Sequence, residues 1–243
     1  MGLIGNASDF EPRAETAETS TAVPGLASGD LQAVGRLMRA VQTRDPEAAR
    51  HARRMAAVCA LLAERLGCSR SEVWLIWVAS HLHDVGKLEL DRGVLDHPGP
   101  LTPESRRAVQ RHPLASQRML GWRSSSSLFR TAAQIARTHH ERYDGSGYPQ
   151  GLSGAEIPLV GRIAAVADVF DALLSERPYR SALELSDAVG VLSGGRGTQF
   201  DPAVLDALLE DLSEAVMIRS GFGESASSAE AYSLVSDMLA VPA

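Results

Sequence analysis

Apolar residues recur every three or four positions over most of the chain after residue 30. This spacing places them on one face of an α-helix. The clearest example is residues 45–67. Asp45 suits the N-cap of that helix, Pro46 its first turn and Gly67 its C-terminal end. The apolar stripe of this predicted helix consists of Met55, Val58, Leu62 and Leu66.

Similar signals predict the rest of the fold. Capping residues and first-turn prolines mark the starts of helices, and glycines or serine clusters mark their ends. No stretch alternates apolar and polar residues as a half-buried strand does, so we predict an all-α fold. The further helices are expected at residues 71–88, 102–120, 128–140, 158–174, 184–193 and 202–213.

The two ends of the chain differ from this helical body. Residues 1–29 are rich in Ala, Glu, Thr, Ser, Gly and Pro and lack periodicity, a composition that cannot bury enough apolar surface to offset the entropy lost on ordering. We predict a flexible tail there, a main domain over residues 30–213 and an extension over residues 214–243. In the extension, Ser227 and Glu230 match a capping box that would start a short helix. The apolar face of that helix, which could pack on the body or on a second subunit, consists of Tyr232, Val235 and Met238 or Leu239.

Composition and charge exclude several classes of protein. The 243 residues are 44% hydrophobic, as in an ordinary globular chain. Lys and Arg number 24 against 30 Asp and Glu, a net charge of −6 that gives no general attraction to a nucleic acid polymer or an anionic membrane. Cys59 and Cys68 lack a CxxC pattern and predict buried thiols. With no signal peptide and no membrane-length apolar run, we expect a cytoplasmic protein without membrane insertion.

Candidate chemistry begins with His83 and Asp84 in the segment LIWVASHLHDVGK. We predict that the pair lies in the middle of an apolar helix, where an unpaired charged group costs several kcal/mol. A bound cation would remove that cost. Upstream, Glu47 and His51 lie four residues apart, so they share one helical face and could bind an ion from the same side.

Further imidazoles and carboxylates follow downstream. They lie in or beside apolar helices, where polar groups need partners. A lone buried histidine, by contrast, is more often a hydrogen-bonded core residue, as we expect of His81 and His97. The candidate set comprises His112, His139, His140, Asp168 and Asp171.

A set of imidazoles and carboxylates without a thiolate suits iron or manganese, and catalytic zinc less selectively. The set is larger than one octahedral ion accepts, so we expect more than one ion. Two ions about 3.5–4 Å apart can share a hydroxide nucleophile and neutralise a phosphate, which makes phosphoester hydrolysis the expected reaction. Lys87, Arg177 and Arg180 are placed in the sequence to bind phosphate oxygens.

Four motifs occur in this order along the chain: HLHDVGK, HHERYDGSGYPQGL, ADVFDALLSERPYR and GTQFDP. With them, residues 45–213 resemble the HD-GYP family of cyclic di-GMP phosphodiesterases, a branch of the HD phosphohydrolases. An HD pair is common to many phosphohydrolases, whereas the long glycine-containing motif is specific to this branch. The resemblance implies an HD-domain-type helical bundle with an ordered GYP loop, in which residues 30–213 are the catalytic domain. It also implies hydrolysis of cyclic di-GMP to pGpG or GMP by metal-bridged hydroxide.

The resemblance also implies roles for individual residues. His83, Asp84 and Lys87 would be catalytic. Glu47 matches an additional ligand of relatives with three ions, so three divalent ions are favoured over two, with iron preferred to manganese. The implied metal ligands are Glu47, His51, His83, Asp84, His112, His139, His140 and Asp168. The implied substrate-binding residues are Asp45, Lys87, Tyr148, Asp171, Arg177 and Arg180.

Two alternatives remain open. The chain could be a catalytically weak sensor of a cyclic dinucleotide that signals through a protein partner, although the full ligand set argues against this. It could also hydrolyse another cyclic dinucleotide, because cationic side chains bind phosphates without distinguishing bases. A second copy of the chain or a signalling protein is the expected partner. One departure from the family pattern, His97 in place of a lysine before a Pro-Gly turn, concerns loop conformation.

Overall fold

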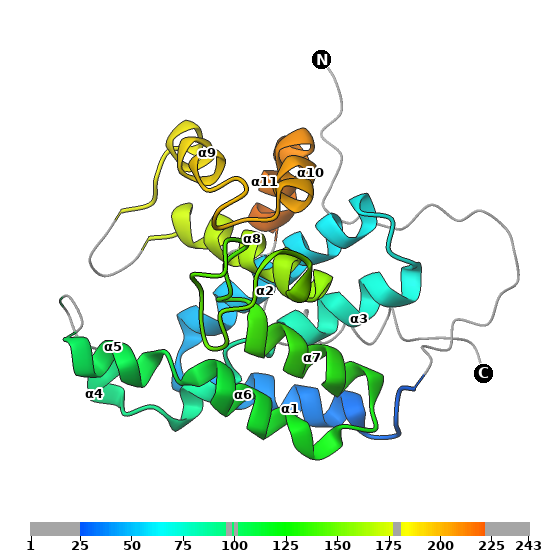
Figure 1. The fold of residues 1–243 in the computed structure, drawn as a ribbon. Coiled ribbons are helices and arrows are strands. Elements are labelled where there is room, and N and C mark those ends of the chain that lie inside the picture. The colour runs from blue at the N-terminus through cyan, green and yellow to red at the C-terminus, as the bar shows by residue number, and fades with distance from the viewer. Residues whose placement is uncertain (1–24, 96–98, 100–101, 177–180, 222–243) are drawn as a thin grey trace, which may run out of the picture.

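The computed structural model describes residues 25–95, 99, 102–176 and 181–221, which form a helical body (Figure 1). This part of the chain contains no strand, only two isolated β-bridges, so the predicted all-α fold is confirmed. Short 3-10 helices are η2 (Val85–Glu89), η3 (Gly121–Arg123) and η4 (Gly154–Glu156). The α-helices are α1 (Asp30–Arg44), α2 (Pro46–Arg65), α3 (Arg70–Ser80), α4 (Arg92–Leu95), α5 (Pro103–Val109), α6 (His112–Leu120), α7 (Ser127–Thr138), α8 (Leu159–Leu173), α9 (Leu185–Gly194), α10 (Pro202–Glu210) and α11 (Leu212–Gly221).

Helix α2 lies at the centre of the body and packs against α1, α3, α8 and α11 (Figure 1). It starts as the sequence predicts, because the Asp45 side chain accepts a hydrogen bond of 2.9 Å from the Ala48 amide. The predicted apolar stripe faces the core, and each fully buried side chain of this kind contributes roughly 1.5–3 kcal/mol. The largest buried side chains of the core include Phe129, Phe170, Phe200, Leu120 and Ile163.

The helix expected over residues 71–88 is shorter than predicted. It ends at Ser80, and His83 and Asp84 therefore lie in a turn between α3 and η2 instead of inside a helix. The Ser80 carbonyl accepts hydrogen bonds from both the amide and the imidazole of His83, three residues on, which closes the helix. The HD pair is thus placed by a helix end.

The helix expected over residues 102–120 is divided into α5 and α6 at residues 110–111. Pro113 has no amide proton and cannot bond the Val109 carbonyl, four residues before it. The imidazole Nδ1 of His112 bonds that carbonyl instead, at 2.6 Å. A single proline therefore ends one helix and orients the histidine that begins the next.

The structure differs from the expected domain limits in two places. Helix α11 crosses residue 213 and packs on α2, so the helical body continues to Gly221. Residues 25–29, expected in the flexible tail, are held in place, because the Gly25 carbonyl accepts from the Ser127 amide and Asp30 accepts from Ala27 and Ser126. Residues 1–24 and the helix expected after Ser227 lie outside the described residues.

Helix α6 packs closely against η2. The Gly86 amide donates to the Ser116 hydroxyl at 2.8 Å, and a Cβ at this glycine would lie 2.4 Å from both the His112 carbonyl oxygen and the Ser116 nitrogen. The glycine of the HDVGK segment is therefore required by packing. None of the helices in the described part of the chain has both the length and the apolar character needed to cross a bilayer.

We expect Gly86→Ala to reduce the free energy of unfolding by about 2–3 kcal/mol, because backbone atoms of α6 must move to admit the methyl group. Urea unfolding followed by circular dichroism measures this change. The matched control is Gly190→Ala in α9, where a Cβ meets nothing within 4 Å and alanine should add about 0.5–1 kcal/mol. Equal stability of the two variants would contradict the packing argument.

Candidate metal centre

Histidine and aspartate side chains from separate helices converge beside α2. Asp168 lies in α8 and His51 in α2, whereas the others lie at helix ends: the turn after α3, the start of α6 and the end of α7. Their ligand atoms form two groups, each with all atoms within 4.8 Å of one another. The first group is His51, His83 and Asp168, and the second is Asp84, His112, His139 and His140.

Asp84 connects the two groups. Its Oδ2 lies 3.3 Å from Nε2 of His83, and its Oδ1 lies 2.9 Å from Nε2 of His112 and 3.7 Å from Nε2 of His139. In the other group, Nε2 of His51 lies 3.0 Å from Oδ1 of Asp168. Seven of the eight predicted metal ligands therefore belong to one of the two groups. The eighth, Glu47, belongs to neither.

Backbone carbonyls orient three of the imidazoles. The Nδ1 atom of His83 bonds the Ser80 carbonyl at 2.9 Å, that of His112 bonds Val109, and that of His139 bonds Ile135 and Ala136 at 3.1 and 3.0 Å. A carbonyl can only accept, so Nδ1 carries the proton and Nε2 keeps its lone pair. This is the tautomer that a metal ligand needs.

Two buried polar atoms in this arrangement lack a hydrogen-bond partner, namely Nε2 of His83 and Oδ1 of Asp84. Although Oδ1 of Asp84 is close to Nε2 of His112, both atoms present lone pairs when Nδ1 holds the imidazole proton. Buried unpaired acceptors that face one another are unfavourable without a cation between them. The residues present thus fit divalent metal ions.

The protonation states also suit ligands. Burial lowers the pKa of His140 to about 4, and burial with the neighbouring His140 and His83 lowers the pKa of His139 well below its ordinary value. Both imidazoles are therefore neutral at pH 7 and can donate a lone pair. Burial alone would raise the pKa of Asp84, but Lys87 and His83 outweigh it and hold the pKa well below the ordinary value, so Asp84 is ionised.

His51 differs from the other histidines, because a side chain holds its Nδ1. Oδ2 of Asp171 lies 2.8 Å from it. Burial would lower the pKa of His51, but the hydrogen bonds to Asp168 and Asp171 outweigh it and raise the pKa to about 9. In the protein without metal, His51 therefore carries a proton on each nitrogen at pH 7, and the Nε2 proton takes the place of a cation beside Asp168.

Asp171 was expected to bind substrate, and its placement corrects that expectation. The side chain is fully buried behind His51, where it accepts from Nε of Arg54 at 2.8 Å and from Nε of Arg219 at 2.7 Å. A carboxylate in this position orients the imidazole of His51 and does not reach substrate. Sequence reasoning missed both arginines. Arg54 could have been found from its spacing, three residues after His51 on the same helix.

The GYP loop, which contains Gly147, Tyr148 and Pro149, is held by a residue that sequence reasoning also missed. Glu141 is buried, and its carboxylate accepts from the amides of Gln150, Gly151 and Leu152 at 2.8, 3.1 and 3.2 Å. A Cβ at Gly147 would lie 2.3 Å from the Arg142 nitrogen, so this glycine is needed for close approach. The signal was the charged residue directly after the histidine pair.

Tyr148 of the GYP loop lies over the second group. Its ring stacks on His140, with centroids 4.8 Å apart and an interplanar angle of 25°. Burial raises the pKa of its hydroxyl, so it stays protonated and can donate a hydrogen bond. Lys87 is also at the centre, with its Nζ 2.5 Å from Oδ2 of Asp84.

The remaining predicted residues lie elsewhere. Glu47 is in neither group and pairs with Arg50 and Arg54 at 2.6 and 3.1 Å, and Asp45 is an exposed helix cap. His81 is a buried core histidine, as expected, with Nδ1 bonded to the Trp77 carbonyl. Three predicted positions, Arg177, Arg180 and His97, lie outside the described residues.

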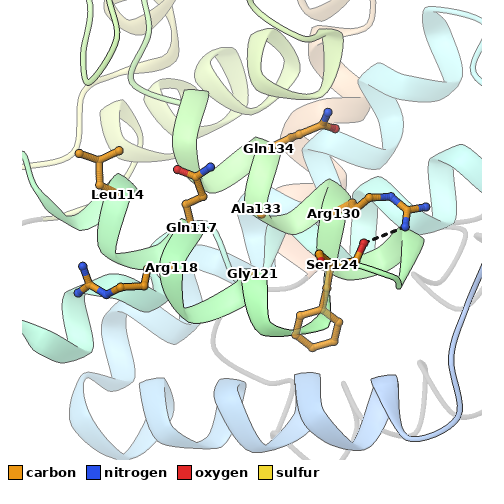
Figure 2. A pocket seen from close by; sticks show the side chains of 9 residues that line it. Leu114, Gln117, Arg118, Gly121, Ser124, Arg130, Ala133 and Gln134 are labelled. Carbon is orange, nitrogen blue, oxygen red and sulfur yellow. Dashed lines mark hydrogen bonds between the residues drawn. The ribbon is translucent and has the colours of Figure 1, made fainter.

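A separate cavity of about 430 Å³ lies between α6, η3 and α7 (Figure 2). Leu114 and Gln117 of α6 line it from one side, and Ala133 and Gln134 of α7 from the other. Its lining includes none of the predicted site residues. The chemistry of the two His and Asp groups, not the size of a cavity, therefore marks the functional site.

Comparisons with known proteins agree with this geometry. The family model described as "HD domain" matches residues 36–204. The chain is 44% identical over 193 residues to the cyclic di-GMP phosphodiesterase response regulator RpfG of Xanthomonas campestris. The alignment covers 79% of this chain and 51% of that protein. It is 38% identical over 205 residues to the 3'3'-cGAMP-specific phosphodiesterase 2 of Vibrio cholerae, with 84% of this chain and 39% of that protein covered. The chain thus spans about half the length of these relatives, or less.

A solved structure shares the fold. The HDG"Y"P protein of Bdellovibrio bacteriovorus superposes with a TM-score of 0.56 at 16% identity, over 75% of this chain and 62% of that chain. At this identity the likeness concerns the fold alone. Together with the family match and the four motifs, it leads to one conclusion. The chain belongs to the HD domain family, in its HD-GYP branch.

Proposed function

We propose that this chain is a metal-dependent phosphodiesterase that hydrolyses cyclic di-GMP to pGpG or on to GMP. The observation that carries the proposal is the pair of adjoining His and Asp groups, in which Nε2 of His83 and Oδ1 of Asp84 are buried without a hydrogen-bond partner. Support for the substrate comes from RpfG, which is named as a cyclic di-GMP phosphodiesterase. The charge of the site fits a phosphodiester only if cations are present, because Asp84 and Asp168 are both ionised.

The two groups support two divalent ions, with the first held by His51, His83 and Asp168. Asp84, His112, His139 and His140 would hold the second, and Asp84 is placed between them. Imidazole and carboxylate ligands without thiolate favour iron, with manganese as the second choice. When bound, such ions activate water for attack and neutralise charge on the phosphate.

The chain's own groups have separate tasks in this reaction. Lys87 keeps Asp84 ionised, and its half-buried ammonium group lies at the edge of the centre, where it can bind a phosphate oxygen that is not held by metal. Tyr148 of the GYP loop can donate a hydrogen bond from its protonated hydroxyl to substrate. Arg177 and Arg180 are proposed to bind the phosphates as well.

A second candidate substrate is 3'3'-cGAMP, because a relative at 38% identity is named as specific for it. Lys87 and the arginines would bind the phosphates of either dinucleotide equally well. The discriminating contacts must therefore involve the bases. A pure sensor function is less well supported, since seven of the predicted ligands are brought together here.

We expect the purified, metal-loaded chain to hydrolyse cyclic di-GMP faster than 3'3'-cGAMP or cyclic di-AMP, with product identified by chromatography. Replacing His83 and Asp84 with alanine should lower the rate on the order of 1,000-fold, because both groups lose a ligand. Trp122→Ala, an exposed position away from the centre, serves as the control. Full activity of the double variant would refute the proposal, and faster turnover of another dinucleotide would change its substrate.

We expect Glu47→Ala to leave the metal content at two ions per chain, because Glu47 binds Arg50 and Arg54 and belongs to neither group. Elemental analysis of protein purified without air measures this content. Asp168→Ala is the comparison and should lose one ion. Loss of one ion from a three-ion protein on Glu47→Ala would instead show that this side chain binds a third ion.

Metal binding at His51 should depend on pH. A metal ion must displace the Nε2 proton of His51, whose pKa is raised to about 9, so affinity is reduced below this pH. We expect the Mn²⁺ affinity of the first group to rise about tenfold per pH unit from about pH 7 and to level off near pH 9. Titrations at constant ionic strength measure this slope. His51→Gln should bind more weakly and with a flatter pH dependence, and an equally steep slope would exclude His51 as its source.

A further inference from the structure

Asp171 is a charged group in a fully buried position, so its partners decide whether it can stay ionised. Its side chain has no exposed surface, and a buried carboxylate is strongly unfavourable without paired donors. One partner is His51, through Nδ1 at 2.8 Å. The others are two guanidinium groups from helices that lie far apart in the sequence.

Arg54 of α2 bonds both carboxylate oxygens, with Nε 2.8 Å from Oδ1 and Nη2 3.0 Å from Oδ2. Arg219 of α11 approaches from the other helix, with Nε 2.7 Å from Oδ1. Asp171 therefore has donors from α2 and α11 that fix the plane of its carboxylate. The direction in which it holds the imidazole of His51 follows from that plane.

Arg219 makes two more contacts, of which Arg54 shares only the one to the Ser175 hydroxyl. Its Nη2 donates to the Leu174 carbonyl at 2.7 Å and to the Ser175 hydroxyl at 2.8 Å. Leu174 is the C-cap of α8, and the Ser175 hydroxyl lies 3.2 Å from Oδ2 of Asp171. One guanidinium thus fixes the carboxylate and the end of the helix that carries both Asp168 and Asp171.

Helix α11 is attached independently of this contact. Arg65 of α2 pairs with Asp211 and Glu214 at 2.6 and 2.5 Å, and Ala215 is fully buried. The position of Arg219 is therefore set by α11 as a whole. Residues 212–221 lie beyond the segment 36–204 that the HD family model matches.

We propose that Arg219 is a positioning residue of the metal centre, which acts through Asp171 to hold the Nδ1 atom of His51 and to direct its Nε2 at the metal. This inference rests on the proposed function in one respect, that His51 is a metal ligand. Helix α11 is then a functional part of the catalytic body. The loss of an outer hydrogen-bond partner typically weakens metal binding 10- to 100-fold. Because Arg54 remains in place, we expect the low end of this range.

The test compares Arg219→Met with Arg65→Met in the full chain. Arg65→Met removes ion pairs between α11 and α2 but does not contact Asp171. Metal-free proteins are titrated with Mn²⁺, and the free ion is followed by electron paramagnetic resonance. We expect the dissociation constant at the His51 group to rise about tenfold in Arg219→Met and to stay unchanged in Arg65→Met.

A second measurement needs neither metal nor substrate. In metal-free protein labelled with ¹⁵N-histidine, the Nδ1 proton of His51 should give a resonance protected from exchange, assigned by its absence in His51→Gln. We expect this protection to fall in Arg219→Met and to persist in Arg65→Met. Arg219→Lys keeps a charge near Asp171 without the second set of contacts, so it should be intermediate and keeps the comparison available if the methionine variant does not fold.

The outcomes separate this inference from the proposed function. If the Arg219 variants match wild type in both Mn²⁺ binding and His51 protection, the inference is overturned, even if the chain hydrolyses cyclic di-GMP. If the chain hydrolyses no cyclic dinucleotide but Arg219→Met weakens binding and exposes the proton, the inference stands and the proposed function fails. Equal losses in Arg219→Met and Arg65→Met would assign the effect to the docking of α11, and this also overturns the inference.

Discussion

The hydrogen bond from an imidazole Nδ1 to a backbone carbonyl at a helix end is the interaction on which the candidate metal centre depends. Every α-helix leaves its last carbonyls without amide partners. Here the ends of α3, α5 and α7 give those carbonyls to His83, His112 and His139. The same bond that completes each helix end fixes the tautomer of an imidazole. The packing of the helices therefore also places three of the candidate ligands.

Charge compensation is the second constraint on the centre. Three ionised aspartates, Asp84, Asp168 and Asp171, lie within or directly behind it, while burial keeps His139 and His140 neutral. Asp171 has its counter-charges in protein side chains and is inward-facing. Asp168 lies beside the protonated imidazole of His51, and Asp84 lies beside Lys87. The negative charge of these two carboxylates is therefore less fully balanced by protein groups than that of Asp171. The centre is thus divided into a side balanced by protein and a side that attracts cations.

The sequence predicted what depends on short-range signals. The Asp45 cap, the all-α fold and the seven candidate ligands that lie together follow from capping patterns and from residue types in motifs. It placed the HD pair inside a helix because the segment around it is apolar, whereas the end at Ser80 depends on the His83 side chain. The resemblance assigned Asp171 to substrate, and the contact with Arg219 could not be predicted because Arg219 lies 48 residues further along the chain.

The histidines are held by different kinds of group, so substitutions near them are expected to have different effects. Backbone carbonyls hold three imidazoles, and every amino acid supplies the same carbonyl, so neighbouring positions such as Ser80 and Val109 can vary without loss of that bond. His51 alone in this comparison is held by a side chain. Substitutions at neighbouring positions are therefore expected to leave the orientations of His83, His112 and His139 unchanged. Substitutions around Asp171, in contrast, are expected to change the orientation of His51.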